Sequence, residues 1–317
     1  MKYACDLAAV RSAARRIAGI VHRTPLMTCE TIDRLAGRRI YFKCENLQKT
    51  GSFKFRGATS AVQNLDNETA KRSVVTHSSG NHAQALALAA RIRGIAAHVV
   101  MPRNAPAVKK QAVLGYGGRV VECEPTLADR ERTANELVQS TGGTMIPPFD
   151  HPDVIAGQGT AALEMLEEMP TLEAIVAPVG GGGMLSGFCV AAKGIDSKIR
   201  VYGAEPLNAD DAARSKAGGV WVPQTAPNTI ADGLMTSLGQ LTWPIVRDCV
   251  DGVLTVTEDQ IRSAMRLVWE RMKLVIEPSA AVGVAVILSD EFKAREPGKA
   301  VGVVLCGGNI SLDKLYW

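Results

Sequence analysis

The chain has 317 residues, of which 46% are hydrophobic and 21% are charged, and its net charge is +4. This length favours two lobes or one large α/β unit over a single small domain. The charge is small and spread along the chain, which argues against nucleic acid or an anionic membrane as a partner. No apolar stretch is long enough to span a membrane, and the first 18 residues lack the apolar region of a signal peptide. We therefore expect a cytoplasmic location.

The seven cysteines are odd in number and widely spaced, and no Cys-x-x-Cys pair occurs. This spacing argues against a disulfide framework and against a zinc knuckle. Reduced thiols in a cytosolic enzyme are the simplest interpretation.

The first half of the chain alternates between segments with helical spacing of apolar residues and short β-rich runs. The expected helices are 6–20, 53–65, 81–93, 108–114 and 128–140, and the expected strands are 39–44, 73–76, 96–101 and 118–123. Such alternation is typical of a parallel sheet with crossover helices.

The second half repeats this pattern. It has expected strands at 174–179, 200–204 and 300–305 and expected helices at 186–193 and 258–272. We expect an α/β fold with discontinuous lobes, in which a small mobile lobe (73–150) is inserted into a large cofactor-binding lobe (1–72 and 151–317). Periodicity alone does not give that boundary.

The first motif that carries chemistry surrounds Lys54. Phe53 and Phe55 flank this lysine, and Gly51-Ser52 places it at the start of a helix. An amine held between a helix start and aromatic surfaces is partly desolvated, which lowers its pKa and makes it a nucleophile toward an aldehyde. For a single lysine, the competing interpretation is an ordinary surface charge.

The second motif is a run of four glycines, Gly180, Gly181, Gly182 and Gly183, between an apolar strand and an apolar helix. Bare backbone N–H groups and the helix dipole suit an anion at this position. The run is neither a dinucleotide fingerprint nor a Walker loop, so a single phosphate is the expected ligand. A flexible loop is the competing interpretation.

The third motif spans residues 76–84 and lies between a strand and a helix, where α/β folds commonly bind ligands. Its serine and asparagine side chains, with the N–H groups of the helix start, could hold a carboxylate. Simple capping of the helix by Ser79 or Asn81 explains the motif equally well.

These three motifs, in this order, resemble the fold-type II pyridoxal 5′-phosphate (PLP) enzymes, whose fold is like that of the tryptophan synthase β chain. The resemblance runs from Thr24-Pro25 through residues 154–160 to residues 306–309. It implies two parallel-sheet lobes with PLP in the cleft between them. Within the family, the chain is most similar to the serine racemases and the serine/threonine dehydratases.

The resemblance also implies a role for individual residues. Lys54 would hold PLP as the Schiff-base lysine and act as a base on one face, with Ser79 on the opposite face. The cofactor would further contact Phe53, Asn81 at its 3′-oxygen, Gly180, Gly181, Gly182, Gly183 and Met184 at the phosphate, and Cys306 at the pyridine nitrogen. The substrate would contact Ser78, Ser79, Asn81, His82 and, from the small lobe, Arg130.

A divalent-cation site is implied in the same way. Glu205, Asp211 and the carbonyl of Ala209 resemble the cation ligands of serine racemases, and such oxygen ligands suit Mg²⁺, Ca²⁺ or Mn²⁺. Read without the resemblance, these residues are a turn with acidic caps.

Two features depart from the family. Cys306 stands where many members have serine or threonine, and a thiol is a weaker hydrogen-bond donor. Residues 149–151 differ from the amide-containing stretch of nucleotide-binding animal serine racemases, although Gln84 and Tyr116 match that nucleotide site. Activation by a nucleotide is therefore in doubt.

The function implied is a PLP-dependent serine racemase with L-serine and L-threonine dehydratase (ammonia-lyase) activity, acting on a small hydroxy amino acid as a homodimer. The alternative is a dedicated ammonia-lyase for L-threo-3-hydroxyaspartate or threonine, because residues 312–317 and the Arg130 region are similar to hydroxyaspartate dehydratases. A PLP-binding protein without turnover is the non-enzymatic alternative.

Overall fold

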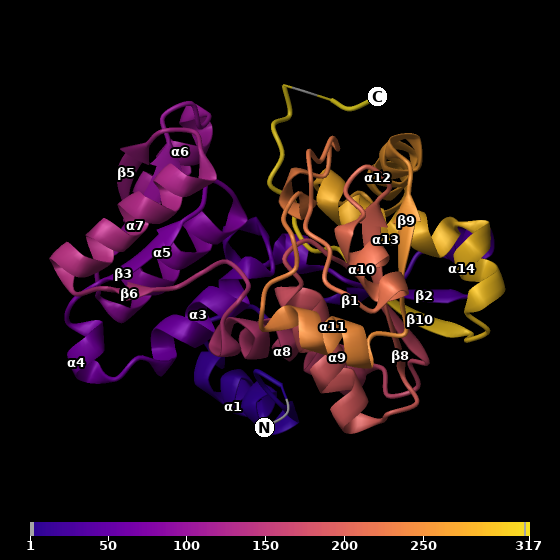
Figure 1. Cartoon of the computed structure of the whole chain (residues 1–317). Coiled ribbons are helices and arrows are strands. Elements are labelled where there is room, and N and C mark those ends of the chain that lie inside the picture. The colour runs from indigo at the N-terminus through magenta and orange to yellow at the C-terminus, as the bar shows by residue number, and fades with distance from the viewer. Residues whose placement is uncertain (1–2, 314) are drawn as a thin grey trace.

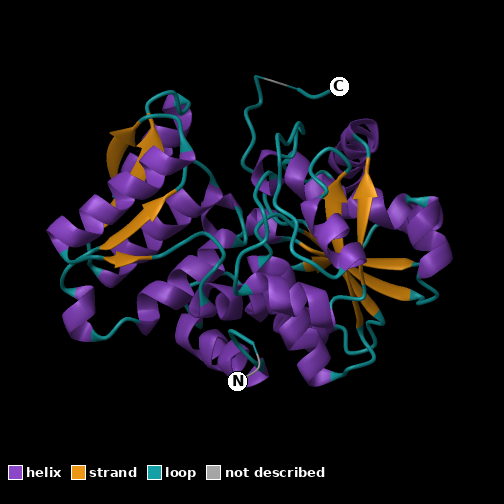
Figure 2. Ribbon diagram, in the orientation of Figure 1, coloured by secondary structure: helices purple, strands orange, loops and turns teal. Residues whose placement is uncertain are grey.

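The computed structural model describes residues 3–313 and 315–317, so Lys314 of the C-terminal segment lies outside the described residues. Figure 1 shows two groups of strands, and Figure 2 shows helices around and between them. Both groups are built mainly of parallel strands, as the alternation of helices and strands predicts.

The larger sheet has six strands in the order β1-β2-β10-β7-β8-β9. All neighbours are parallel except the short β1, which pairs antiparallel with β2. The strands are β1 (Leu26–Met27), β2 (Arg39–Lys43), β10 (Ala300–Val304), β7 (Ala174–Pro178), β8 (Arg200–Pro206) and β9 (Gly252–Val256).

The smaller sheet has four parallel strands in the order β5-β4-β3-β6. They are β5 (Arg119–Cys123), β4 (Ala97–Pro102), β3 (Val74–His77) and β6 (Thr144–Met145). All four lie within the segment that the sequence assigns to the small lobe.

Fourteen α-helices are assigned in the described residues. They are α1 (Leu7–Ile17), α2 (Glu30–Ala36), α3 (Lys54–Asn64), α4 (Asn67–Ala70), α5 (Asn81–Arg93), α6 (Ala107–Gly115), α7 (Leu127–Thr141), α8 (Pro152–Glu168), α9 (Gly183–Ile195), α10 (Asp211–Gly218), α11 (Thr242–Cys249), α12 (Glu258–Met272), α13 (Pro278–Leu288) and α14 (Asp290–Arg295). Short 3₁₀ turns occur at Glu45–Leu47, Lys49–Gly51 and Asp232–Leu234. The helices expected at 81–93 and 258–272 are confirmed with the same bounds.

The helix α3 belongs to the packing of both lobes. Its residues Phe55, Ala58 and Val62 share one hydrophobic cluster with Val74 of the small sheet and Val154 of α8. In Figure 1, α3 and α8 lie between the two sheets. Lys54, the first residue of α3, therefore lies where the two lobes meet. Within the described residues, no helix is long and apolar enough to cross a membrane.

Candidate active site

Lys54 is the first residue of α3. Its Nζ donates a hydrogen bond to the carbonyl of Pro148 at 2.7 Å and lies 5.1 Å from the centre of the Phe53 ring. Burial lowers the pKa of Lys54 to about 8, although the neighbouring Cys306 and Glu277 act in the opposite direction. The side chain is half-buried and its amine is hydrogen-bonded, so Lys54 is not an ordinary surface charge. An amine with this pKa is partly neutral near physiological pH.

Cys306 lies two residues after the carboxyl end of β10 and is buried. Its carbonyl accepts the backbone N–H of Phe53 at 3.0 Å, and Ser52 forms an isolated bridge with Gly307. Burial and the nearby Glu277 raise the pKa of the Cys306 thiol well above its usual value. This side chain is therefore a neutral thiol beside the segment that carries Lys54.

Glu277 is a site residue that the sequence analysis missed. Its carboxylate accepts hydrogen bonds from Asn81 Nδ2 at 2.9 and 3.1 Å and from the N–H of Asn309 at 3.2 Å. Burial raises the pKa of Glu277 to about 7. The one sequence signal for this residue is its position directly before Pro278 and the apolar helix α13.

Asn81 is held by two neighbours. Its Oδ1 accepts a hydrogen bond from Asn309 Nδ2 at 2.8 Å, and the same nitrogen of Asn309 lies 2.7 Å from the carbonyl of Thr50. Its own Nδ2 is engaged with Glu277. These bonds fix the orientation of the amide at the start of α5.

The 76–84 motif does not act as a helix cap. The N-cap of α5 is Gly80, and no side chain makes a capping bond there. Ser78 Oγ accepts the N–H of Gly80 at 3.3 Å, whereas Ser79 is half-buried in the same loop. Simple capping by Ser79 or Asn81 is therefore wrong, which leaves ligand binding as the remaining interpretation of the two.

His82 is buried, and its Nε2 lies 2.9 Å from the carbonyl of Ile146. Burial and the positive charge of Lys54 lower the pKa of His82 to about 3. A neutral ring that donates from Nε2 to a carbonyl has an acceptor at Nδ1, and this atom has no partner among the described residues. In this tautomer, Nδ1 does not complement a carboxylate.

The four glycines form a tight loop between β7 and α9. A Cβ atom at Gly181 would lie 2.3 Å from the Phe149 ring, and one at Gly183 would lie 2.9 Å from Phe149 Cβ. Gly182 has φ +84°, which side-chain-bearing residues rarely adopt. The first N–H groups of a helix have no intrahelical partner, so this cradle fits a phosphate group.

The segment that returns from β6 to α8 touches three parts of the site. Pro148 accepts the Lys54 hydrogen bond, Phe149 covers the glycine loop, and Asp150 accepts the N–H groups of Gln240 and Leu241 at 3.0 and 2.8 Å. Phe149, one of the residues that depart from the family pattern, thus packs directly on the glycine loop.

Arg130 lies in the first turns of α7. Burial lowers the pKa of His77 and raises that of Cys123, and the charge of Arg130 acts on both groups, which places it near the carboxyl ends of β3 and β5. Its Nε is buried and has no hydrogen-bond partner in the described part of the chain. No interaction joins Arg130 to Lys54 among the described contacts.

The residues of the implied cation site lie close together after β8. Glu205 accepts the N–H groups of Ala212 and Ala213 at 3.1 and 2.8 Å, and Asp211 Oδ2 accepts that of Leu238 at 3.3 Å. Asp211 Oδ1 is buried without a partner. Burial, helped by Asp211, raises the pKa of Glu205 to about 9.

The described residues contain no group of three or more His, Cys, Asp or Glu side chains that could hold a metal ion. A cation here would be held by two carboxylates and a carbonyl. The buried unpaired oxygen of Asp211 and the chemistry of these donors fit a hard cation.

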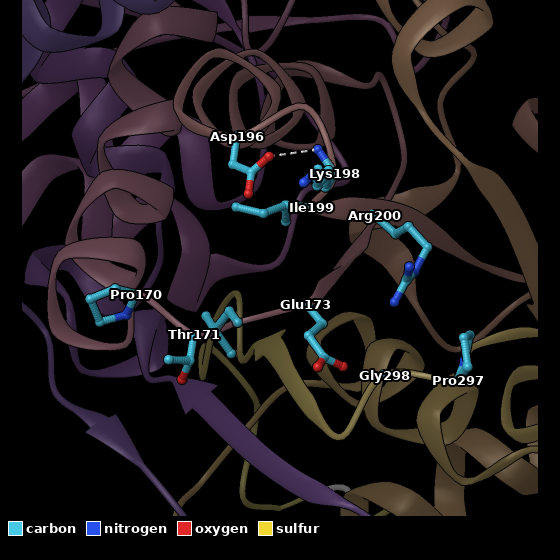
Figure 3. Close-up of a pocket in the computed structure, with 10 residues that line it drawn as sticks. Pro170, Thr171, Glu173, Asp196, Lys198, Ile199, Arg200, Pro297 and Gly298 are labelled. Atoms are coloured by element: carbon cyan, nitrogen blue, oxygen red, sulfur yellow. Dashed lines mark hydrogen bonds between the residues drawn. The ribbon is translucent and has the colours of Figure 1, made fainter.

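A separate concavity of about 440 Å³ lies at the amino ends of β7, β8 and β10. Figure 3 shows Glu173 and Arg200 lining it, with Asp196 bonded to the backbone of Lys198. Arg200 is already paired with the buried Glu296 at 2.6 Å. Lys54 lies at the start of α3, and the glycine loop follows the carboxyl end of β7, so this concavity is not the site described above.

The comparisons with known proteins agree with this geometry. Residues 17–307 match the family model described as "Pyridoxal-phosphate dependent enzyme". The chain is 51% identical to a serine racemase of Dictyostelium discoideum, over 96% of this chain and 95% of the relative.

Two solved structures show the same similarity. The structure of maize serine racemase superposes with a TM-score of 0.97 at 47% identity and covers 99% of this chain and 96% of that chain. A threonine deaminase from T.th. superposes with a TM-score of 0.92 at 45% identity and covers 97% of this chain and 99% of that chain. The chain therefore belongs to the family of pyridoxal-phosphate dependent enzymes.

Proposed function

We propose that this enzyme racemises serine and also eliminates ammonia from L-serine and L-threonine to give the 2-oxo acid. The observation that carries the proposal is the half-buried, hydrogen-bonded amine of Lys54, with a pKa of about 8, at the start of α3 where the lobes meet. The similarity to serine racemases along nearly the whole chain supports the substrate class.

Lys54 would hold PLP covalently and then exchange protons with the Cα of the substrate. When bound, PLP stabilises the electron pair left at Cα after the C–H bond breaks. A partly neutral amine can accept that proton near pH 8, and its hydrogen bond to Pro148 orients the lone pair.

Ser79 would deliver a proton to the opposite face of Cα, which inverts the configuration of the amino acid. Its loop precedes α5 and lies next to Asn81, whose amide is fixed by Glu277 and Asn309. Loss of the β-hydroxyl in place of reprotonation would lead to a 2-oxo acid and ammonia.

The remaining site residues would bind the cofactor and the substrate. The phosphate would lie in the loop of Gly180, Gly181, Gly182, Gly183 and Met184, with Phe53, Asn81 and Cys306 around the ring. Ser78, Ser79, Asn81, His82 and Arg130 would contact the substrate. The neutral Cys306 supports a pyridine nitrogen that is largely unprotonated.

A divalent cation, Mg²⁺, Ca²⁺ or Mn²⁺, would bind to Glu205, Asp211 and the carbonyl of Ala209. It would supply the charge that two buried carboxylates lack. Asp211 also holds the backbone of Leu238, and a Cβ at Gly182 would meet Leu238 at 2.7 Å. The cation would therefore support the loop that packs on the phosphate cradle.

The second candidate is a dedicated ammonia-lyase for L-threo-3-hydroxyaspartate or threonine. The buried, unpaired Nε of Arg130 favours it, because an arginine without a partner suits a second substrate carboxylate. The similarity to threonine deaminase supports a lyase as well.

Three organisational features complete the proposal. The enzyme would act as a cytoplasmic homodimer. Residues 73–150 would form a small mobile domain that closes over the substrate, against a large domain of residues 1–72 and 151–317. The separate four-stranded sheet supports this division. Because α3 packs between the two sheets, the hinge would lie close to Lys54.

The test is to incubate the holoenzyme and Mg²⁺ separately with L-serine, L-threonine and L-threo-3-hydroxyaspartate. Chiral chromatography follows the D-amino acid, and a coupled assay follows the 2-oxo acid in the same tube. D-Serine with pyruvate supports the first function. Oxaloacetate from hydroxyaspartate with little turnover of serine contradicts it and supports the second.

A further inference from the structure

The first turn of α3 is capped from a distant helix. The N-cap residue Phe53 makes no side-chain capping bond, and the first turn contains no acidic residue. The N–H of Gly57 donates to Gln158 Oε1 of α8 at 3.0 Å, across 101 positions of sequence. Gln158 is 1% exposed, so this bond is protected from water. The start of the Lys54 helix therefore depends on α8 for a partner.

Arg56 provides a second link between the same helices. A buried guanidinium near a helix N-terminus is unfavourable both by desolvation and by the helix dipole. Its nitrogens contact Glu45 at 2.8 Å, Glu164 of α8 at 2.7 Å, Thr160 Oγ1 of α8 at 3.1 Å and the carbonyl of His22 at 3.2 Å. An arginine that is fully buried and held by two carboxylates fixes its own helical turn rigidly.

The backbones of α3 and α8 also approach very closely. A Cβ at Gly157 would lie 2.7 Å from Gly57 Cα. Beyond it along α8, a Cβ at Gly159 would lie 2.7 Å from the carbonyl oxygen of Gly187 in α9. Since α9 follows directly from the glycine loop, α8 lies against both the helix that carries Lys54 and the helix that completes the phosphate cradle.

We infer that Gln158 and Arg56 are positioning residues for Lys54, which hold the first turn of α3 on α8 and so set the place of the amine relative to the glycine loop. This inference rests on the proposed role of Lys54 as the PLP-binding lysine. It does not depend on which amino acid the enzyme converts.

The test compares three variants of Gln158. Gln158→Met removes the acceptor at similar length, Gln158→Asn keeps the amide but is too short to reach Gly57, and Gln158→Glu keeps an acceptor at the same position. The Nε2 of Gln158 has no hydrogen-bond partner in the described structure, so the Glu variant loses no bond. Leu172→Ala, a buried position before β7, is the control for a general loss of stability.

Two readouts do not require turnover. In the apoprotein, hydrogen exchange at the first turn of α3 should be faster for Gln158→Met and Gln158→Asn than for Leu172→Ala. In the PLP-loaded protein, the pH midpoint of the lysine-bound PLP absorbance should shift in the same two variants. Gln158→Glu should keep both values close to those of the unmodified chain.

Activity gives the third readout. Displacement of a reacting group by about 1 Å costs roughly a hundredfold in rate, so kcat should fall between tenfold and a hundredfold while KM changes little. Arg56→Lys, which loses the two-carboxylate geometry, should show the same pattern. If Gln158→Met does not fold, Gln158→Asn and Arg56→Lys decide the question.

The inference is overturned if Gln158→Asn and Arg56→Lys lower the melting temperature as Leu172→Ala does but leave the exchange of α3, the absorbance midpoint and kcat unchanged. A shifted absorbance midpoint in these variants, together with no turnover of serine by the unmodified chain, would contradict the proposed function only.

Discussion

The amide nitrogen of Asn81 lies 2.9 and 3.1 Å from the two carboxylate oxygens of Glu277, in a corner that also contains Lys54 and Cys306. This pair joins the start of α5 to the start of α13. The contact holds the amide of Asn81 in one orientation, so an acidic residue that the sequence does not mark becomes part of the site.

Glu277→Gln should change how stability depends on pH. Burial raises the pKa of Glu277 from 4.5 to about 7 in the folded apoprotein. The folded state therefore binds more protons than the unfolded state between these values, and the stabilisation, present below pH 4.5, is lost as the pH rises to 7. The loss should be on the order of 3 kcal/mol.

Urea unfolding of the apoprotein at several pH values measures this effect. The free energy of unfolding of the Gln variant should depend much less on pH across the same range. If the free energy of unfolding changes with pH at the same rate in both proteins, the pKa of Glu277 is not raised on folding.

Lys54→Ala should abolish the absorbance of lysine-bound PLP and all turnover. In the unmodified apoprotein, the rate of PLP attachment should rise with pH and level off above about pH 8, because the neutral amine is the nucleophile. Stopped-flow absorbance across pH 6–10 in ~0.5-unit steps measures this rate. Lys71→Ala, at an exposed lysine, is the control and should attach PLP and turn over substrate as the unmodified chain does. A plateau reached only above pH 10 would contradict a lowered pKa of Lys54.

Gly181→Ala should weaken PLP binding, because the new Cβ would overlap the Phe149 ring. Overpacking of this kind costs about 1–3 kcal/mol, which is a fall in affinity of roughly five- to a hundredfold. Fluorescence titration of the apoprotein with PLP gives the affinity. Combining Gly181→Ala with Phe149→Ala should restore part of the lost affinity for PLP. If the affinity is not restored, the methyl group blocks the phosphate directly.

Mg²⁺ should raise the melting temperature, because a cation at the proposed site would bind the folded state through ligands that the unfolded chain does not assemble. Asp211→Asn should remove most of this gain, since the amide supplies no negative charge to the cation. Differential scanning calorimetry with and without chelator gives the comparison, and Asp259→Asn, on the exposed start of α12, is the matched control. An identical response to Mg²⁺ in both variants would place the cation elsewhere.

The sequence predicted most helices and strands that have one polar face and one apolar face. The helix α12 has a polar face and an apolar face, and its bounds match the prediction. By contrast, α8 and α13 are buried on almost all sides, so they show no apolar stripe, and both were missed. Glycines within α8 reduce the helical signal further.

The site was predictable only where residues cluster in sequence. Lys54 and the glycine loop stand in recognisable local motifs. Glu277 and Gln158 act through contacts with Asn81 and Gly57, which lie 196 and 101 positions away. No local pattern marks such residues, because their environment exists only after the lobes pack.

The most direct test of the central claim is a comparison of Ser79→Ala with the unmodified holoenzyme on L-serine. D-Serine and pyruvate are measured in the same reaction. Formation of D-serine should fall by at least ~100-fold, in line with the contribution of a general acid or base, while pyruvate continues to form from L-serine. If both products persist at their original ratio, Ser79 does not deliver the proton, and the proposed racemisation mechanism is wrong.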